Sequence, residues 1–233
     1  MTHQCIMRCR IFFSPRNLKH ILLIMYNKVL IIDDHPVLRF AVRVLMEKEG
    51  FEVIGETDNG IDGLKIAREK IPNLVVLDIG IPKLDGLEVI ARLQSLGLPL
   101  RVLVLTGQPP SLFARRCLNS GAAGFVCKHE NLHEVINAAK AVMAGYTYFP
   151  STTLSEMRMG DNAKSDSTLI SVLSNRELTV LQLLAQGMSN KDIADSMFLS
   201  NKTVSTYKTR LLQKLNATSL VELIDLAKRN NLA

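Results

Sequence analysis

Three carboxylates, a threonine and a lysine in this 233-residue chain have the side chains that phosphoryl chemistry needs: Asp33, Asp34, Asp78, Thr106 and Lys128. Carboxylates held close together repel one another and need a cation, and oxygen ligands suit Mg²⁺. With a metal bound, one carboxylate can attack a phosphoryl group and form an aspartyl phosphate. Lys128 and the metal would neutralise charge on the transferring oxygens, and Thr106 would hydrogen-bond one of them.

These residues follow short apolar runs that are typical of buried parallel strands. The runs are Val29–Ile32 before Asp33 and Asp34, Leu74–Leu77 before Asp78, Val102–Leu105 before Thr106, and Ala123–Cys127 before Lys128. A fifth strand is predicted at Phe51–Glu56, and helical patterns lie near 36–49, 60–71, 85–96, 110–120 and 131–145. Five such units predict a doubly wound α/β fold. The carboxyl ends of its strands line one crevice, so we expect the five side chains to converge there.

The chain changes character after residue 147. Polar and small residues dominate Ser151–Thr168, which predicts a linker with a short helix near Leu154–Met159. Only helical patterns follow it. The predicted N-caps are Ser174 with Glu177, Ser189 with Asp192, and Ser200, and the third and fourth helices are predicted at 201–215 and 219–228.

The third of these helices has one apolar and one polar face. Val204, Tyr207, Lys208, Leu211 and Leu215 follow the spacing of an inward face. Small polar side chains framed by cations face outward, which suits a helix in the major groove of DNA. The same pattern also fits an ordinary solvated helix surface. The predicted DNA contacts are Lys191, Lys202, Thr203, Ser205, Thr206, Lys208, Thr209, Arg210 and Gln213.

Charge and composition narrow the class of function. The net charge is +6, but residues 25–150 hold 14 basic and 14 acidic side chains, whereas residues 168–233 hold eight basic and five acidic ones. A basic C-terminal block behind a neutral body favours nucleic-acid binding by that block. No apolar run approaches the roughly 18 to 20 residues that span a bilayer, so no membrane role is expected. The four cysteines show no zinc or disulfide spacing, which indicates a reduced cytoplasm.

The first 24 residues look foreign to this fold. They carry four basic side chains and no acidic one, and a short apolar run follows at Ile21–Met25. No small-residue cleavage site of a signal peptide comes after that run. We expect a disordered N-terminal extension or an over-long start, with Met25 as an alternative initiator.

Residues 28–145 resemble a receiver domain. The resemblance is carried by Asp33-Asp34, by Asp78 ahead of Ile79-Gly80-Ile81-Pro82 and Asp85-Gly86, and then by Thr106 and Lys128. It implies that Asp78 accepts phosphate from a sensor histidine kinase. It also implies that Asp34, Asp78 and the Gly80 carbonyl bind Mg²⁺, with Asp33 assisting through water, and that Thr106 and Phe125 form a switch. Gly107 and Ile81 depart from the family's usual alanine and frequent methionine, which removes no catalytic group.

Residues 168–233 resemble the LuxR-type four-helix motif. The matching stretches are Leu173–Glu177, Gly187–Ala194 and Ser200–Val204. A receiver followed by this motif resembles the NarL/FixJ class of response regulators. That resemblance implies a receiver domain over 25–146 with strand order 2-1-3-4-5, a linker over 147–167, and an all-α helix-turn-helix domain over 168–233.

The resemblance also implies how such a protein acts. Phosphorylation of Asp78 is expected to favour a homodimer that binds promoter DNA and meets RNA polymerase, and Val221, Ile224 and Leu226 are candidates for the dimer contact. The chain would assist its own phosphorylation and dephosphorylation without being a turnover enzyme. From Met25 onward it also resembles one virulence activator of the class, which implies a hybrid sensor kinase and virulence promoters.

Two alternatives remain open from the sequence. A phosphatase of the haloacid-dehalogenase type also uses Asp, Thr and Lys, but it expects its nucleophile in an Asp-x-Asp of the first strand and its acidic pair late in the chain. Here the pair comes first, and Asp33-Asp34 has no residue between. A protein-interaction switch without a DNA role is the second alternative, with the C-terminal helices serving only to dimerise.

Overall fold

The structure is a computed structural model, and it describes residues 27–129, 131–151, 170, 172–230 and 232. Its N-terminal part holds one parallel sheet with strand order β2-β1-β3-β4-β5, as the receiver resemblance implied. The strands are β1 (Lys28–Ile32), β2 (Glu52–Thr57), β3 (Leu74–Leu77), β4 (Arg101–Thr106) and β5 (Gly124–Cys127).

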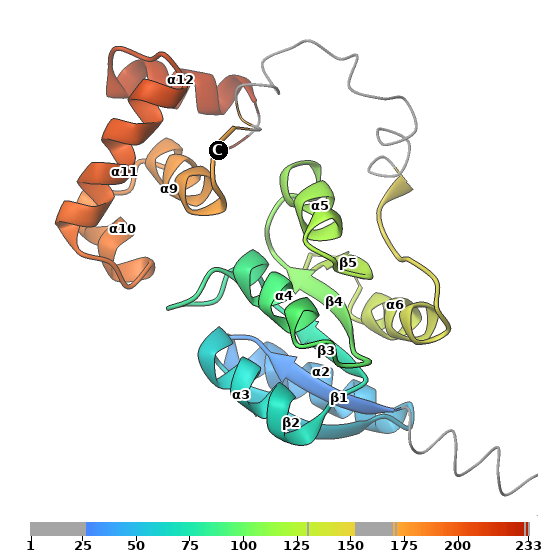
Figure 1. Ribbon diagram of the computed structural model, residues 1–233. Helices are drawn as coiled ribbons and strands as arrows, with labels where there is room; N and C mark the ends of the chain where they lie inside the picture. The colour runs from blue at the N-terminus through green and yellow to red at the C-terminus, as the bar shows by residue number, and fades with distance from the viewer. Residues whose placement is uncertain (1–26, 130, 152–169, 171, 231, 233) are drawn as a thin grey trace, which may run out of the picture.

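Five helices cover the two faces of this sheet. They are α2 (Pro36–Lys48), α3 (Gly60–Lys70), α4 (Gly86–Ser95), α5 (Pro110–Asn119) and α6 (His133–Met143). Helices α2 and α6 pack on one face, and α3, α4 and α5 pack on the other (Figure 1). The predicted elements are all present, with ends shifted by one or two residues.

The apolar runs of the strands follow from this two-sided cover. Alternate residues of a strand point to opposite faces. Val29 and Ile31 belong to the cluster under α2 and α6, whereas Leu30 and Ile32 belong to the cluster under α3 and α4. All four side chains are at most 1% exposed. Both faces of β1 are buried, so none of these positions suits a polar side chain. The polar residues Asp33 and Asp34 therefore follow directly after the strand.

Four further helices form a separate bundle. They are α9 (Asn175–Ala185), α10 (Asn190–Ser196), α11 (Asn201–Lys214) and α12 (Leu220–Arg229). Helix α9 packs against each of the other three. Ser174 and Ser189 both close the predicted capping boxes, with Glu177 and Asp192 respectively, and the Ser200 side chain accepts from the Thr203 amide.

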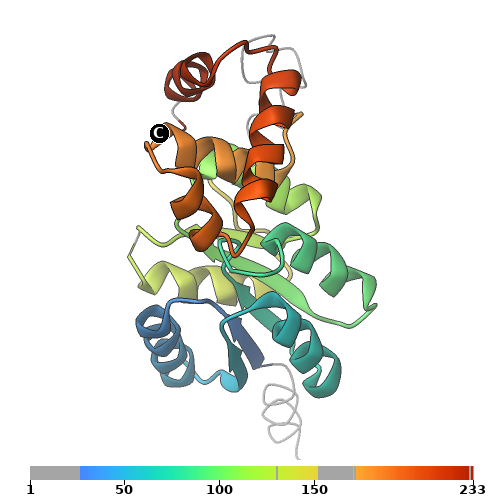
Figure 2. The same cartoon turned by 90° about the vertical axis from the view of Figure 1, so that its left-hand side faces the viewer.

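The bundle lies on the side of the α/β domain that carries α5 and the loop before α4 (Figures 1 and 2). The helix predicted near Leu154–Met159 lies outside the described residues. Among the helices that the structure describes, none is long and apolar enough to pass through a membrane.

Candidate functional site

The predicted convergence of strand ends is present. Asp33 follows β1, Asp78 follows β3, Thr106 ends β4 and Lys128 follows β5. Asp33 and Asp78 are 3% exposed and Thr106 is fully buried, although all three are polar. Buried carboxylates need cationic or hydrogen-bonding partners, so the partners that they have define what the pocket can do.

Lys128 joins two of the carboxylates. Its Nζ lies 2.6 Å from Asp78 Oδ2 and 2.8 Å from Asp33 Oδ2. Burial of the ammonium works against its charged form, but Asp78 and Asp33 outweigh this and raise the pKa of Lys128 above its ordinary value. Lys128 therefore remains a cation beside the Asp78 and Asp33 carboxylates, where it can neutralise negative charge.

Asp34 has no such hydrogen bond. Its Oδ1 is buried and accepts none from the residues that the structure describes, although the ring of the neighbouring His35 lies beside it. Burial, with the charges of Asp78 and Asp33, raises the pKa of Asp34, and His35 and Lys128 oppose this rise. An orphaned carboxylate oxygen next to two more carboxylates fits a bound cation, and the all-oxygen set of three aspartates fits Mg²⁺.

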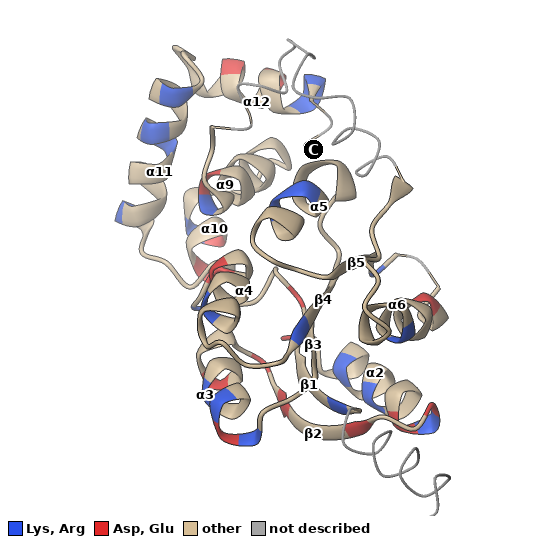
Figure 3. Cartoon of the chain, turned by 45° about the vertical axis from the view of Figure 1, so that its right-hand side comes forward, with Lys and Arg blue, Asp and Glu red and all other residues tan. Residues whose placement is uncertain are grey.

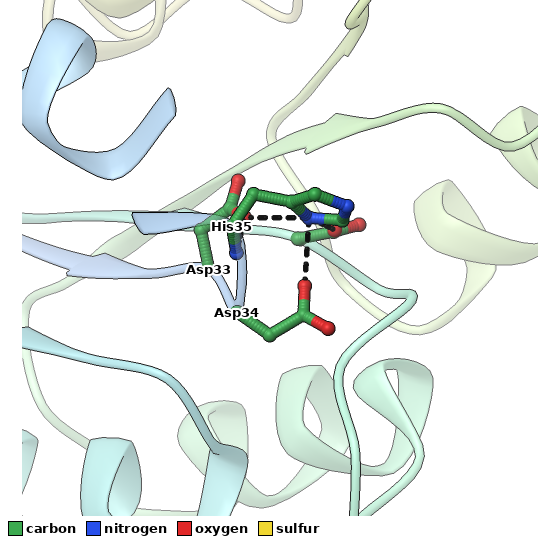
Figure 4. A group of neighbouring side chains, drawn as sticks. Asp33, Asp34 and His35 are labelled. Atoms are coloured by element: carbon green, nitrogen blue, oxygen red, sulfur yellow. Dashed lines mark hydrogen bonds and ion pairs between the residues drawn. The ribbon is translucent and has the colours of Figure 1, made fainter. Parts of the chain in front are cut away.

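His35 is a member of this pocket that the sequence analysis missed. Its Nδ1 lies 2.8 Å from Asp34 Oδ1, 3.2 Å from Asp33 Oδ1 and 4.0 Å from Asp78 Oδ2. Figure 4 shows the ring turned toward the carboxylates of Asp33 and Asp34. Its position directly after the acidic pair was the available signal, because a residue next to two pocket residues on one loop must lie near the pocket.

The loop after Asp78 is held in place by backbone contacts. The Gly80 amide donates to Asp78 Oδ1 at 2.9 Å, and Asp85 caps α4 by accepting from the Leu87 amide at 2.9 Å. A Cβ on Gly86 would lie 2.3 Å from the Ile79 Cα, so only glycine allows this approach. The loop, with Gly80 at its start, therefore stays beside the Asp78 carboxylate.

The two departures from the receiver pattern are accommodated. Ile81 is 7% exposed and packs in the core. A Cβ on Gly107 would meet only His129 Nε2, at 3.9 Å, so this site has room for the usual alanine but does not need it. Thr106 Oγ1 accepts from the Gln108 amide at 3.3 Å, and Phe125 is 2% exposed.

The outer face of α11 carries the predicted DNA contacts. The side chains of Lys202, Ser205, Thr206, Thr209, Arg210 and Gln213 are exposed, as is Lys191 on α10. Val204 and Leu211 are fully buried, and Leu215 is 4% exposed, which confirms the inward face. Lys and Arg positions, blue in Figure 3, recur along the α11 ribbon. Some predicted contacts hydrogen-bond to other side chains of the same domain: Lys208 Nζ donates to Asn190 Oδ1 at 3.1 Å, and Thr203 Oγ1 lies 2.8 Å from Ser200 Oγ.

The prediction for α12 was wrong at one residue. Leu226 is 7% exposed and packs in the core of the bundle, so it is not available to a partner. Its neighbours along the core face are Leu223 and Ala227, because α12 turns that face toward α9. Val221 is 68% exposed, and Ile224 is half-buried.

Contacts between the two domains were also missed by the sequence analysis. Arg116 on α5 donates to the carbonyls of Ile170 and Leu173 and to the side chain of Asn175. Arg176 on α9 donates to the Lys83 carbonyl at 3.0 Å, in the loop before α4. A cleft lies between the domains, lined by this loop with Asp34 and Gln108 on one side and by α9 and α10 on the other. Single arginines on helices give no sequence signal for such contacts.

Comparison with known proteins decides the family. Residues 29–140 match the response regulator receiver domain, and residues 171–227 match the bacterial regulatory proteins of the luxR family. A Pseudomonas aeruginosa protein whose name describes a transcriptional regulator is 57% identical over 88% of this chain and 99% of its own length. The chain belongs to the LuxR-type response regulators. It is thus a two-component response regulator with a DNA-binding domain rather than a turnover enzyme.

Other relatives are similar to this chain over most of their own length. The fimbriae Z protein of Salmonella typhimurium is 40% identical over 88% of this chain and 97% of its own length. The DNA-binding transcriptional activator EvgA of Escherichia coli K12 is 35% identical over 87% of this chain and 98% of its own length. Among solved structures, the Salmonella typhimurium response regulator RcsB shares the fold with a TM-score of 0.61 at 24% identity, covering 87% of this chain and 96% of that one. A LuxR-family response regulator from Aurantimonas aligns with 57% of this chain and 95% of its own at a TM-score of 0.53 and 28% identity.

Proposed function

We propose that phosphorylation of Asp78 by a sensor histidine kinase switches this response regulator into a dimer that binds promoter DNA and controls transcription. The supporting observation is the buried Asp78 carboxylate, held 2.6 Å from Lys128 Nζ beside two further aspartates. We assign the receiver to 25–146, the linker to 147–167 and the DNA-binding domain to 168–233. We also propose a cytoplasmic location, because kinase and promoter DNA meet there.

The proposed transfer uses the residues of the pocket in separate roles. An Asp78 oxygen attacks the phosphorus, the bond from phosphorus to the donor's imidazole nitrogen breaks, and that nitrogen keeps the bonding electrons and takes up a proton. Lys128 neutralises a phosphoryl oxygen, and the Thr106 hydroxyl donates to another. Asp34, Asp78 and the Gly80 carbonyl would hold Mg²⁺, with Asp33 assisting through water; the ion supplies positive charge to the transferred group.

The proposed switch couples this pocket to the receiver surface. Thr106 would turn toward the arriving phosphoryl group, and Phe125 would follow into the space that it vacates. Both side chains are buried in the present structure, so neither can move without a change in the packing around it. The switch would favour a dimer in which two α11 helices reach neighbouring half-sites, and engagement of the second half-site then becomes intramolecular.

The DNA contact is proposed to use the exposed face of α11. The hydroxyls of Ser205, Thr206 and Thr209 each donate to the carbonyl four residues earlier. These exposed hydroxyl oxygens can also accept, which suits the amino groups of adenine or cytosine in the major groove. Lys191, Lys202 and Arg210 would contact phosphates.

Finer features of the function rest on similarity alone. From Met25 onward the sequence resembles the Bordetella virulence activator BvgA, and this supports a hybrid sensor kinase as donor and activation of virulence genes through RNA polymerase. Val221 and Ile224 are proposed as dimer contacts on α12, in agreement with the exposure of Val221.

The decisive experiment compares Asp78→Asn with Asp58→Asn in the full chain. Asp58 follows β2 and is exposed, so it is a matched control at the same edge of the sheet. With acetyl phosphate and Mg²⁺, the wild type and Asp58→Asn should take up phosphate and bind promoter fragments more tightly in footprinting, whereas Asp78→Asn should do neither. If Asp78→Asn bound promoter DNA as the phosphorylated wild type does, the proposed switch would be wrong.

A further inference from the structure

An aromatic side chain is exposed in the turn that joins α10 to α11 (Figure 1). Its neighbours Met197 and Leu199 are partly buried and pack on the core of the bundle, whereas Phe198 is 67% exposed. The Phe198 backbone lies in the left-handed region, with φ at 54°. This conformation strains a residue that has a Cβ, and glycine adopts it freely. Phe198 therefore holds a large apolar side chain in water on a strained backbone.

The turn itself does not need a phenyl ring at this position. Helix α10 ends in a Schellman motif, in which the Phe198 amide donates to the Asp195 carbonyl at 3.4 Å. The Leu199 amide donates to the Ala194 carbonyl at 2.8 Å. The apolar contact that accompanies this motif belongs to the residue after the left-handed one, which is Leu199. The ring of Phe198 thus takes part in neither the hydrogen bonds nor the packing of the turn.

The two neighbouring helices end in the same motif with less strained residues. After α9 the left-handed position is Gly187, at φ 82°, and after α11 it is Asn216, at φ 50°. Their amides and those of the residues that follow make the corresponding hydrogen bonds. Glycine and asparagine are the residues that adopt this conformation most readily. A phenylalanine at the turn before α11 therefore points to a role outside the fold.

The charge around this turn favours a polyanion as the partner of the ring. Residues 196–213 contain three basic side chains, Lys202, Lys208 and Arg210, and no acidic one. In a helix-turn-helix the first helix crosses the DNA backbone, and the N-terminal part of the second enters the major groove. The turn between them then lies at the edge of the groove, beside the sugar–phosphate backbone.

We propose that Phe198 packs on deoxyribose carbons of the DNA backbone beside α11 and strengthens DNA binding whatever the base sequence. The inference rests on the proposed function, because it takes α11 as the helix that enters the groove. The sugar carbons are the apolar part of a backbone whose phosphates attract the cations of α11. Contact with them removes the ring of Phe198 from water, which favours the bound state.

A sugar contact has its own signature in binding measurements. A phosphate contact releases a counterion and steepens the salt dependence of binding, whereas an apolar contact with a sugar releases none. A base contact discriminates among sequences, whereas the sugar is the same in every sequence. Loss of the Phe198 ring should therefore weaken binding to target and scrambled DNA by the same factor and leave the salt slope unchanged.

The test compares Phe198→Gly and Phe198→Ala with Asn216→Gly in the full-length chain. Asn216→Gly changes the same position of the motif after α11 and is the matched control. Phe198→Gly removes the ring and the strain, and Phe198→Ala removes the ring alone. Thermal unfolding measures the strain. Fluorescence anisotropy measures binding to a footprinted promoter duplex and to a scrambled duplex at several salt concentrations, with acetyl phosphate and Mg²⁺ present, and in vitro transcription is measured alongside.

We expect both Phe198 variants to lose about tenfold in affinity for both duplexes, with the salt slope of the wild type. Phe198→Gly should also unfold about 4–8 °C higher than the wild type, because it relieves left-handed strain in a domain of this size. Phe198→Ala should not gain this stability, and Asn216→Gly should change neither affinity nor unfolding temperature measurably.

Several results would overturn the inference. Unchanged affinity with reduced transcription would assign the ring to a protein partner, and unchanged affinity and transcription would leave it without a role in either. A loss confined to the promoter duplex would indicate a base contact. A lower unfolding temperature in both Phe198 variants would show that the ring stabilises the bundle itself. If the wild type bound neither duplex in a salt-dependent way, the DNA contact of the proposed function would fail as well.

Discussion

Arg116 and Asn175 join the two domains across 59 positions of sequence, with Arg116 Nη1 2.9 Å from Asn175 Oδ1. The same guanidinium donates to the Leu173 carbonyl at 2.9 Å and to the Ile170 carbonyl at 3.0 Å. Asn175 is the first residue of α9. One side chain of the receiver therefore holds the chain segment that leads into the DNA-binding domain.

Loss of this contact should loosen the domain boundary. Arg116→Ala removes three charge-assisted hydrogen bonds, and each charged bond contributes about 1.5–3 kcal/mol in favourable cases. Because Arg116 is only half-buried, we expect a total on the order of 2 kcal/mol. Hydrogen exchange should speed up in residues 172–178, whereas Arg92→Ala on α4, which breaks an exposed pair with Glu88, should leave this segment unchanged. If residues 172–178 exchanged hydrogen equally slowly in Arg116→Ala and Arg92→Ala, Arg116 would not hold this segment.

Glu177 should make the stability of the DNA-binding domain depend on pH. Burial raises the pKa of Glu177, but hydrogen bonds from Lys214 and Ser174 outweigh this and hold the pKa below its ordinary value of 4.5. A lowered folded pKa stabilises the fold above pH 4.5, and this contribution is lost as pH falls through the folded pKa.

The corresponding variant is Glu177→Gln. At pH 7 it should cost about 1 kcal/mol in the free energy of unfolding, since Lys214 is partly exposed and water screens the ion pair. As pH falls through the folded pKa of Glu177, the difference from the wild type should shrink, because the glutamate then becomes as neutral as the glutamine. Urea unfolding at several pH values measures this, with Asp225→Asn on α12 as an exposed control. A penalty that does not change with pH would contradict the role of the charge.

Gly86 and Gly107 should respond in opposite ways to the same added methyl group. Gly86→Ala places a Cβ 2.3 Å from the Ile79 Cα, a backbone atom that cannot move aside freely. We expect a loss of about 1–3 kcal/mol, as for other overpacked sites, and slower phosphate uptake, because the loop beside Asp78 is displaced. Gly107→Ala has room at 3.9 Å and should change neither property measurably. Thermal unfolding and phosphate incorporation test both variants together.

Two residues on α11 should separate affinity from sequence preference. Lys202→Ala should weaken binding to all DNA sequences alike and lower the salt slope by about one, because a phosphate contact releases about one counterion. Thr206→Val keeps the shape of the side chain but removes its hydroxyl acceptor. It should reduce the difference in binding free energy between target and scrambled DNA by about 1–3 kcal/mol and leave the salt slope unchanged. Binding to a target and a scrambled duplex at several salt concentrations measures both. Lys140→Ala on α6, a receiver lysine paired with Glu49, is the basic control.

The sequence alone determined the sheet, the capped helices and the identity of the pocket residues. Buried strands forbid polar side chains along their length, so the aspartates, the threonine and the lysine could stand only at the strand ends, and parallel strands bring those ends together. Serine caps and the spacing of Val204 and Leu211 likewise fixed α9, α10 and α11 from local chemistry. Only the tertiary structure decided that Leu226 is buried, that the His35 ring turns into the acidic pocket, and that Arg116 holds the segment before α9. Side-chain orientation and contacts between domains depend on atoms far apart in the chain, and no local pattern of residue types encodes them.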